Sequence, residues 1–342
     1  MSELREARTL SLFVAGVLVG CLVATCGYAL VERGRNTSAR DGAVVLKLGH
    51  SLDTAHPVHL AMERMAESLA QKSGGALRLL IAPNGQLGSE TDCIELLQNG
   101  ALALTKTSSA PLEAFVPEMA LFGVPYVFRS EEHFWRVAEG PLGDELLAAG
   151  ETAGLVGLCW YDAGARSFYT KKTPVQSPGD LAGLKIRVQN SQTALRMVEA
   201  LGGSPTPLTF GELYTGLQQG LVDGAENNPP SFHSSRHFEV CKEYSLDEHT
   251  RVPDVLLVSR IWWDRLDEQQ REWLREAALE SAEWQRTEWR RRTEEALAAV
   301  EEAGVTVRRP DTAAFAEKVA PMHASYEGTP IGDLMRRVRE TE

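Results

Sequence analysis

Segments with strand character and segments with helix character alternate along most of the chain, and this order constrains the fold more than any other feature. Short apolar runs typical of strands occur in AVVLKLGH (43–50), ALRLLIAP (76–83), GLVGLCWY (154–161) and GLKIRVQ (183–189). Helix starts lie between such runs, at Pro57, at Ser89 with Asp92, and at Thr209 with Glu212. The alternation predicts α/β architecture with largely parallel sheets.

The length of the chain and one long polar segment predict two lobes. A chain of 342 residues exceeds the size that one hydrophobic core usually serves. Residues 267–303 contain neither glycine nor proline and begin with Asp267 and Gln270 at N-cap spacing, so they predict one helix of about 50 Å. No heptad pattern is sustained along this segment, which favours a helix lying across both lobes over a coiled coil.

The N-terminal segment predicts export from the cytoplasm. Residues 10–31 carry no charge, and Leu18, Val19, Gly20 and Cys21 resemble a lipoprotein cleavage site with a lipid on Cys21. The run is also long enough to remain as an uncleaved membrane anchor, so both forms of residues 1–35 stay open. Either form places Cys93, Cys159 and Cys241 in an oxidising compartment, where an odd number leaves at least one thiol unpaired or bridged elsewhere.

Composition and motifs point away from nucleic-acid binding and from catalysis. The formal net charge of −12 argues against a nucleic-acid partner, and it means that an anion site needs locally concentrated arginines. The sequence contains no P-loop, G-x-G-x-x-G, G-x-S-x-G or H-E-x-x-H motif, and no acidic or cysteine cluster completes its histidine pairs. We therefore expect no metal, no cofactor and no enzymatic activity, but a binding protein whose two lobes close on a ligand.

Arg187 lies in the middle of a predicted strand, where Leu184, Ile186 and Val188 alternate with polar residues. A guanidinium gains little from packing in such a place. Taken alone, a strand arginine is more often a surface ion-pair residue, although its planar fork also suits a carboxylate ligand in a cleft.

Several sequence blocks resemble a known family. LKLGHSLDTAHPVH, PNGQLGSE, VPYVFRSEEH, GARSFYT, DLAGLKIRVQ and LGGSPTPLTFGELYTGLQQGLVDGAENNP are similar to the solute-binding proteins of tripartite ATP-independent periplasmic (TRAP) transporters, of the dicarboxylate type. The resemblance implies a two-lobed fold with a bracing helix, one organic-acid site between the lobes, and delivery to the small and large membrane subunits of an ion-driven permease. We expect lobe 1 over residues 44–163 and about 252–290, and lobe 2 over 164–251 and about 291–342.

The resemblance also implies a set of ligand-binding residues. Arg187 matches the arginine that pairs with the ligand carboxylate, Arg166 a second arginine near the same anion, and Asn227 the asparagine that bonds the carboxylate or a hydroxyl. Salt bridging remains an alternative for Arg166, helix capping for Glu90 and core packing for Tyr214. The resemblance also places Glu90, Phe210 and Tyr214 beside the ligand. His50 and Ser51 are candidates because they end the first predicted strand, where open α/β sheets place their ligands, and Ser109 because its hydroxyl suits a ligand hydroxyl.

Departures from the family pattern set the expected ligand. Ser108, Ser109 and Pro111 stand where sialic-acid-binding members carry an acid and an arginine, and GAENN lacks the aromatic residue of members that bind a keto acid with sodium. YDAGARSFYT and SLDEHT resemble hexuronate-binding members, so we expect glucuronate, galacturonate or a related sugar acid. The first alternative is a C4 dicarboxylate, with Arg166 holding the second carboxylate. A sensory binding protein and an extracytoplasmic sugar-acid lyase or isomerase are further alternatives.

Overall fold

A computed structural model describes residues 42–342 of the chain, and residues 45–342 form one compact unit. The predictions for residues 1–35, including the lipid on Cys21, lie outside the described residues. Among the helices between residues 42 and 342, none has both the length and the apolar character that a membrane span needs.

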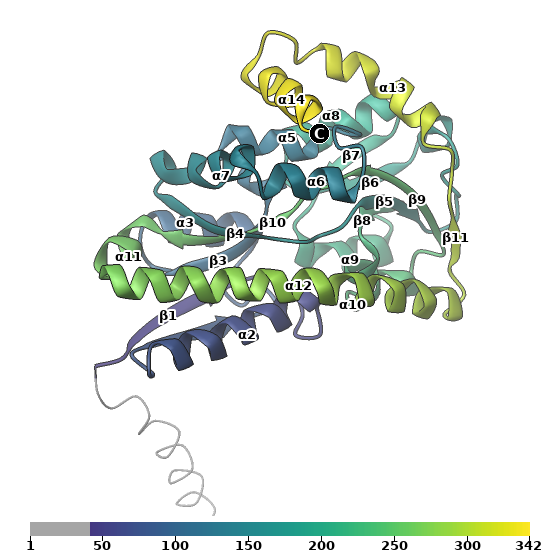
Figure 1. Ribbon diagram of the computed structural model, residues 1–342. Coiled ribbons are helices and arrows are strands. Elements are labelled where there is room, and N and C mark those ends of the chain that lie inside the picture. Colours follow the sequence, from purple (N-terminus) through teal and green to yellow (C-terminus); the bar gives the residue numbers. More distant parts are fainter. Residues whose placement is uncertain (1–41) are drawn as a thin grey trace, which may run out of the picture. The chain divides into compact units, whose positions relative to one another are not determined.

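Two β-sheets organise this unit (Figure 1). The first has five strands in the order β2 (Leu77–Ala82), β1 (Val44–Gly49), β3 (Leu104–Ser108), β10 (Asp254–Ser259) and β4 (Leu155–Tyr161). The second has six, in the order β11 (Thr306–Arg308), β9 (Glu243–Thr250), β5 (Arg166–Thr170), β8 (Gly224–Asn227), β6 (Lys185–Val188) and β7 (Ser204–Pro207). The α/β fold class with two lobes is thereby confirmed.

The prediction that the sheets are largely parallel holds for β1 with β3, for β6 with β7 and β8, and for β9 with β11, but one strand in each sheet departs from it. Strand β10 runs antiparallel to both β3 and β4, and β5 runs antiparallel to both β8 and β9. The reason lies in two connections between the sheets, residues 162–165 from β4 to β5 and residues 251–253 from β9 to β10. Both are far too short for the helical crossover that joins parallel strands, so the chain passes between the sheets as two antiparallel strand pairs.

The predicted helix starts agree with the structure. Pro57 is the first residue of α2 (Pro57–Lys72), and complete capping boxes start α3 (Glu90–Gln98) at Ser89 and α9 (Phe210–Gln219) at Thr209. Each box satisfies backbone N–H groups that the first helical turn leaves without partners. The other α-helices are α4 (Ser109–Leu112), α5 (Ala120–Gly123), α6 (Glu131–Ala138), α7 (Pro141–Ala148), α8 (Gln192–Leu201), α10 (Pro229–Ser234), α11 (Arg260–Arg265), α12 (Glu268–Glu302), α13 (Ala313–Ala324) and α14 (Pro330–Glu340).

The predicted long helix is α12, which has 35 residues and so spans about 52 Å (Figure 1). Its middle holds the link between the sheets, because the Gln285 side chain accepts from Asp162 N and donates to Asp162 O, both at 2.8 Å. Earlier in the helix, Ser281 Oγ lies 2.7 Å from the hydroxyl of Tyr161 on β4. Towards its C-terminus, Val300 packs into the core of the second sheet. The helix therefore braces both sheets.

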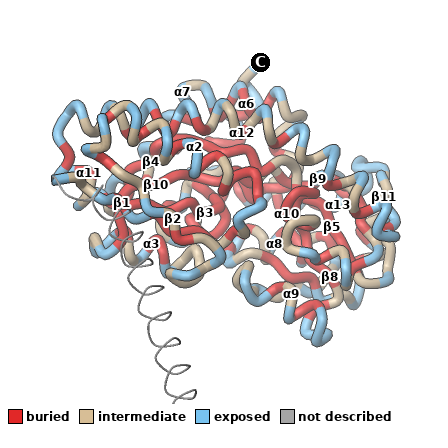
Figure 2. The backbone as a smooth tube through the Cα atoms, turned by 90° about the horizontal axis from the view of Figure 1, so that it is seen from below, coloured by how far each residue is buried: buried red, intermediate tan, exposed pale blue. Residues whose placement is uncertain are grey.

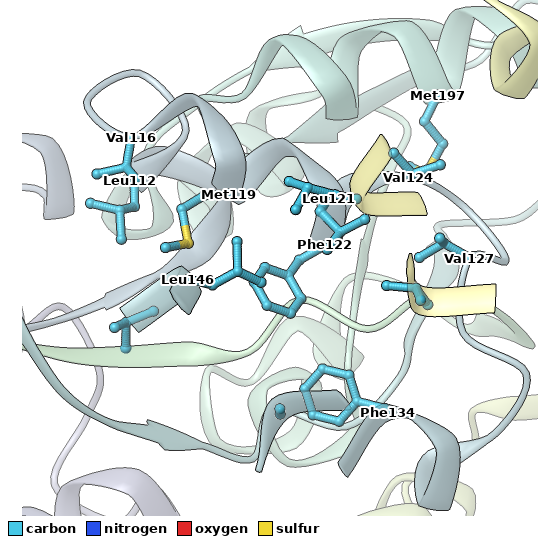
Figure 3. Packing of buried hydrophobic residues seen from close by; sticks show 14 of the residues in the cluster. Leu112, Val116, Met119, Leu121, Phe122, Val124, Val127, Phe134, Leu146 and Met197 are labelled. Atoms are coloured by element: carbon cyan, nitrogen blue, oxygen red, sulfur yellow. The ribbon is translucent and has the colours of Figure 1, made fainter. Parts of the chain in front are cut away.

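Two hydrophobic clusters stabilise the unit, and Figure 2 shows that the strands of both sheets are mostly buried. The larger cluster centres on Phe122, whose ring lies 5.1 Å from that of Trp160 and 6.2 Å from that of Phe134, and it extends to Met197 on α8 (Figure 3). On β5, Phe168 belongs to this cluster and Tyr169 to the smaller cluster under α9 and α10. The second sheet is therefore covered on both faces.

The C-terminal helix α14 joins the larger cluster through Leu334, Met335 and Val338. It packs beside α5, and the Arg337 guanidinium donates to both carboxylate oxygens of Glu145 at 2.9 and 2.6 Å. Residues 330–340, which we expected in lobe 2, thus lie against residues 117–145 of the expected lobe 1.

Candidate functional site

A cleft of about 300 Å³ lies at the ends of strands and starts of helices from both sheets. Its lining residues are Ser51, Asn84, Gly85, Gly88, Ser89, Glu90, Thr91, Pro111, Arg187, Gln189, Asn190, Leu208, Thr209, Phe210, Gly211 and Glu212. A recess of about 30 Å³ adjoins it and shares Ser51, Glu90, Gln189 and Phe210 with the cleft. Polar residues that line the recess but not the cleft include His56, Lys106, Ser108, Arg166, Asn227, Asn228, Ser231 and Asp254.

Arg187 lines the cleft as a buried cation without a counter-charge. Ile186 and Val188, its neighbours on β6, point into the larger core, so strand alternation turns Arg187 to the opposite face, where it is only 2% exposed. Its Nε donates to Leu208 O at 2.9 Å, but Nη1 has no hydrogen-bond partner, and no carboxylate within residues 42–342 forms an ion pair with it. Burial lowers the pKa of this guanidinium, and such a group gains most from an anion.

Arg166, on β5, is buried too but is neutralised within the protein. Its Nε and Nη2 form a bidentate ion pair with the Glu226 carboxylate, and Nη1 donates to Asn227 Oδ1 at 2.8 Å. Burial raises the pKa of Glu226, but Arg166 and the nearby His249 lower it by a larger amount, so the pKa is about 2. The contacts of Arg166 are therefore those expected of the salt-bridge alternative, although the residue also lines the recess.

Lys106 forms the third buried cation of the site, and the sequence analysis missed it. From β3, its Nζ donates to Glu90 Oε1 at 3.1 Å and to Asp254 Oδ1 at 3.0 Å. Burial lowers the pKa of Lys106, yet Asp254 and Glu90 raise it by a larger amount, so the lysine stays charged. Two carboxyl groups share this one ammonium, and burial raises the pKa of Asp254 by more than Lys106 lowers it.

Four more predicted residues line the site. Ser51 and Phe210 border both the cleft and the recess, and Glu90 does so from the start of α3. Asn227 ends β8 at the recess, where its Oδ1 accepts from Arg166 and from Asn228 N. The structure thus brings these residues together with Arg187 and Arg166.

Three predicted residues do not line the cleft or the recess. Both ring nitrogens of His50 are engaged below the site, by Leu52 N at 3.1 Å and by His59 Nδ1 at 2.9 Å. Ser109 is fully buried, and the hydroxyl of Tyr214 donates to Glu239 at 2.8 Å on the surface.

The missed residues differ in how visible they were in the sequence. Lys106 interrupts the strand-like run LALTKTSS and so carries the same signal as Arg187, a cation in the middle of a strand. Asp254 starts a strand after Pro253, which is an ordinary place for a polar residue. The sequence does not show which of the adjacent residues Ser108 and Ser109 lines the recess. In the structure β3 ends at Ser108 and α4 begins at Ser109.

The three cysteines of the described region are free and buried. Burial raises the pKa of Cys93 to about 11 and that of Cys241 to about 12, so neither carries a reactive thiolate near neutral pH. Within residues 42–342, no group of three or more His, Cys, Asp or Glu residues is arranged to hold a metal ion.

Comparisons with known proteins agree with this architecture. Residues 48–329 match the family described as bacterial extracellular solute-binding protein, family 7. A TRAP periplasmic solute-binding protein from Bradyrhizobium sp. BTAi1, solved in complex with galacturonate, is 44% identical and superimposes with a TM-score of 0.84, over 87% of this chain and 100% of that one.

Two further relatives cover a similar share of the chain. The TRAP solute-binding protein from Anaerococcus prevotii, solved with bound glucuronate, is 38% identical with a TM-score of 0.83, over 87% of this chain and 98% of its own. The C4-dicarboxylate-binding periplasmic protein DctP of Rhodobacter capsulatus is 29% identical over 90% of this chain and 92% of its own. The chain belongs to solute-binding protein family 7, the periplasmic solute-binding proteins of TRAP transporters.

Proposed function

We propose that this protein captures a hexuronate, such as galacturonate or glucuronate, outside the cytoplasm and delivers it to a TRAP permease. The observation that carries the proposal is Arg187, a buried guanidinium in the cleft whose Nη1 has no partner among the described residues. A ligand carboxylate would supply the missing charge and accept two parallel hydrogen bonds from the fork.

The distribution of charge favours a ligand with one carboxylate over a C4 dicarboxylate. Arg166 already pairs with Glu226, and Lys106 already pairs with Glu90 and Asp254. A second ligand carboxylate would therefore meet no unpaired cation and would face two acidic side chains at the recess. Since like charges at a buried site are costly, the dicarboxylate alternative is disfavoured, although the Rhodobacter relative binds such a ligand.

The rest of the site suits hydroxyl groups. Carboxylate oxygens of Glu90 and Asp254 accept hydrogen bonds, while Asn227 Nδ2 and the Ser51 hydroxyl can donate them. Phe210 offers an apolar face beside them, as a sugar ring requires. The relatives solved with galacturonate and glucuronate hold ligands of this kind.

The same charges weigh against catalysis. A lyase or isomerase needs a base that is free to take a proton, but Glu90 and Asp254 each bond Lys106, and both ring nitrogens of His50 are engaged. Binding without turnover is the function that this arrangement supports.

Delivery requires closure of the two lobes, for which we propose residues 44–163 with about 252–290 and residues 164–251 with about 291–329, since α14 (Pro330–Glu340) packs on the first of these. The cleft is lined from both, by Ser51 and Glu90 on one side and Arg187 and Phe210 on the other. The surface that both lobes form on closure would then dock on the small and large permease subunits. A lipid on Cys21, or residues 10–31 retained as an uncleaved anchor, would tether the protein to the membrane. A sensory receptor remains the alternative partner.

The test is a thermal-shift screen of residues 36–342 against hexuronates, aldonates and C4 dicarboxylates, followed by calorimetric titration of each hit. We expect one-to-one binding of a hexuronate, no binding of succinate or malate, and an unchanged ligand by NMR after prolonged incubation. Binding of succinate without binding of any hexuronate would overturn the ligand class. Conversion of the sugar acid would overturn the binding function.

A further inference from the structure

We infer that the recess beside the cleft is a subsite for one ligand hydroxyl group, recognised by Ser108 together with Glu90 and Asp254. This inference rests on the proposed function, because it assigns one part of the hexuronate to one part of the site. It concerns residues that the sequence analysis did not assign to the ligand, Ser108 and Asp254.

Ser108 provides the first observation. It is 4% exposed and lines the recess, yet its Oγ makes no hydrogen bond to any residue between 42 and 342. A buried hydroxyl without a partner is costly, and most such groups in native proteins have one. Ser108 ends β3 at the wall of the recess, where rotation about its Cα–Cβ bond can turn the hydroxyl, a donor and an acceptor, toward a ligand group.

The two carboxylates provide the second observation. Lys106 occupies Glu90 Oε1 and Asp254 Oδ1, and Ser108 N also donates to Glu90 Oε1 at 3.1 Å. The other oxygen of each carboxylate makes no hydrogen bond within the described residues. Lys106 thus fixes the orientation of two acceptors at the wall of the recess. A hydroxyl placed between them and Ser108 donates to a carboxylate and accepts from the serine.

Size and charge define what the recess takes. A volume of about 30 Å³ holds a group as large as one water molecule, but not a sugar ring. Lys106 is already paired with Glu90 and Asp254, so the recess offers no unpaired cation to a ligand carboxylate, whereas a hydroxyl is neutral and can donate. The subsite therefore selects for one hydroxyl at a fixed distance from the carboxylate that Arg187 holds.

The chain offers a matched control for this subsite. Ser109 is the next residue, is fully buried and also has an Oγ without a partner among residues 42–342, but it does not line the recess or the cleft. Ser108→Ala and Ser109→Ala each remove one buried hydroxyl, so their difference reports the contact with the ligand and not the general effect of losing a buried oxygen.

The experiment titrates wild type, Ser108→Ala and Ser109→Ala with D-galacturonate and with its monodeoxy analogues. We expect one analogue to bind wild type at least about 100-fold more weakly than D-galacturonate, because it leaves the polar groups of the recess without a partner. We expect Ser108→Ala to weaken D-galacturonate about tenfold and to leave the affinity for that same analogue unchanged. Ser109→Ala should bind every compound like wild type.

Two results would overturn the inference while the proposed function stands. In the first, Ser108→Ala binds D-galacturonate as tightly as wild type. In the second, it weakens all analogues, including the critical one, by the same factor. If wild type binds neither D-galacturonate nor D-glucuronate, the proposed function fails and the hydroxyl subsite falls with it.

Discussion

Replacing Arg187 by methionine should make the ligand-free protein more stable while it removes ligand binding. The guanidinium is 2% exposed, has no ion-pair partner in the described region, and makes one hydrogen bond to a neutral carbonyl, Leu208 O. That bond contributes about 1 kcal/mol, whereas burying a charge without a partner costs several kcal/mol. Methionine has a similar length and no charge, so we expect a gain of about 1–2 kcal/mol in the free energy of unfolding.

The control is the same substitution at Arg166, for which we expect the opposite sign. Arg166→Met would leave Glu226 buried without its bidentate partner, and His249, at 3.6 Å, would compensate only in part. Breaking a buried ion pair on one side typically costs 3–5 kcal/mol, so we expect a loss of about 3 kcal/mol. The two arginines lie on neighbouring regions of one sheet, and only their pairing differs.

The assay combines urea unfolding of both ligand-free variants with calorimetric titration of a hexuronate. Arg187→Met should bind at least about 100-fold more weakly than wild type, and Arg187→Lys about 30-fold more weakly, because lysine keeps the charge but loses the fork, a difference of about 2 kcal/mol. If Arg187→Met loses as much stability as Arg166→Met, then Arg187 is a structural residue and the reasoning is refuted.

Four further predictions concern the whole unit. Burial lowers the pKa of His249, but Asp247 and Glu226 raise it by a larger amount, so the pKa is about 9. The free energy of unfolding should therefore fall as pH rises from about 6.5 through 9, and it should fall less in a His249→Gln variant. Glu226, with a pKa of about 2, should lose its stabilising contribution only as pH falls below about 4.5, and acid unfolding curves measure this. In a protein comprising residues 36–342, the three buried thiols should react with Ellman's reagent only after denaturation, and rapid reaction in the native state would contradict their burial. Small-angle scattering should show a smaller radius of gyration with hexuronate, and an unchanged value in a saturated sample would contradict closure.

Much of the fold could be predicted because its determinants are local. The caps at Ser89 and Thr209 and the long segment after Asp267 act within a few residues, and all start helices as expected. The direction of β5 and β10 could not be predicted, because it depends on two short connections, residues 162–165 and 251–253, that carry no hallmark of a passage between sheets.

The candidate site could be predicted only in part, for the same reason. Strand alternation and family resemblance point to Arg187, and the resemblance points to Arg166, but neither reveals that Arg166 is paired with Glu226, 60 positions away in the sequence. Lys106 and Asp254 are separated by 148 positions and meet only because β3 and β10 are neighbours. Which of two adjacent serines faces the recess depends on the single residue at which β3 ends.

The central claim is that Arg187 holds the single carboxylate of a hexuronate in the cleft, and a crystal structure of the complex with D-galacturonate tests it most directly. We expect the two carboxylate oxygens at about 2.7–2.9 Å from two nitrogens of the Arg187 guanidinium, the distance of a charge-assisted bidentate pair. We also expect Arg166 to keep its ion pair with Glu226. A carboxylate bound by Arg166 or Lys106, with Arg187 still without an anionic partner, would contradict the account.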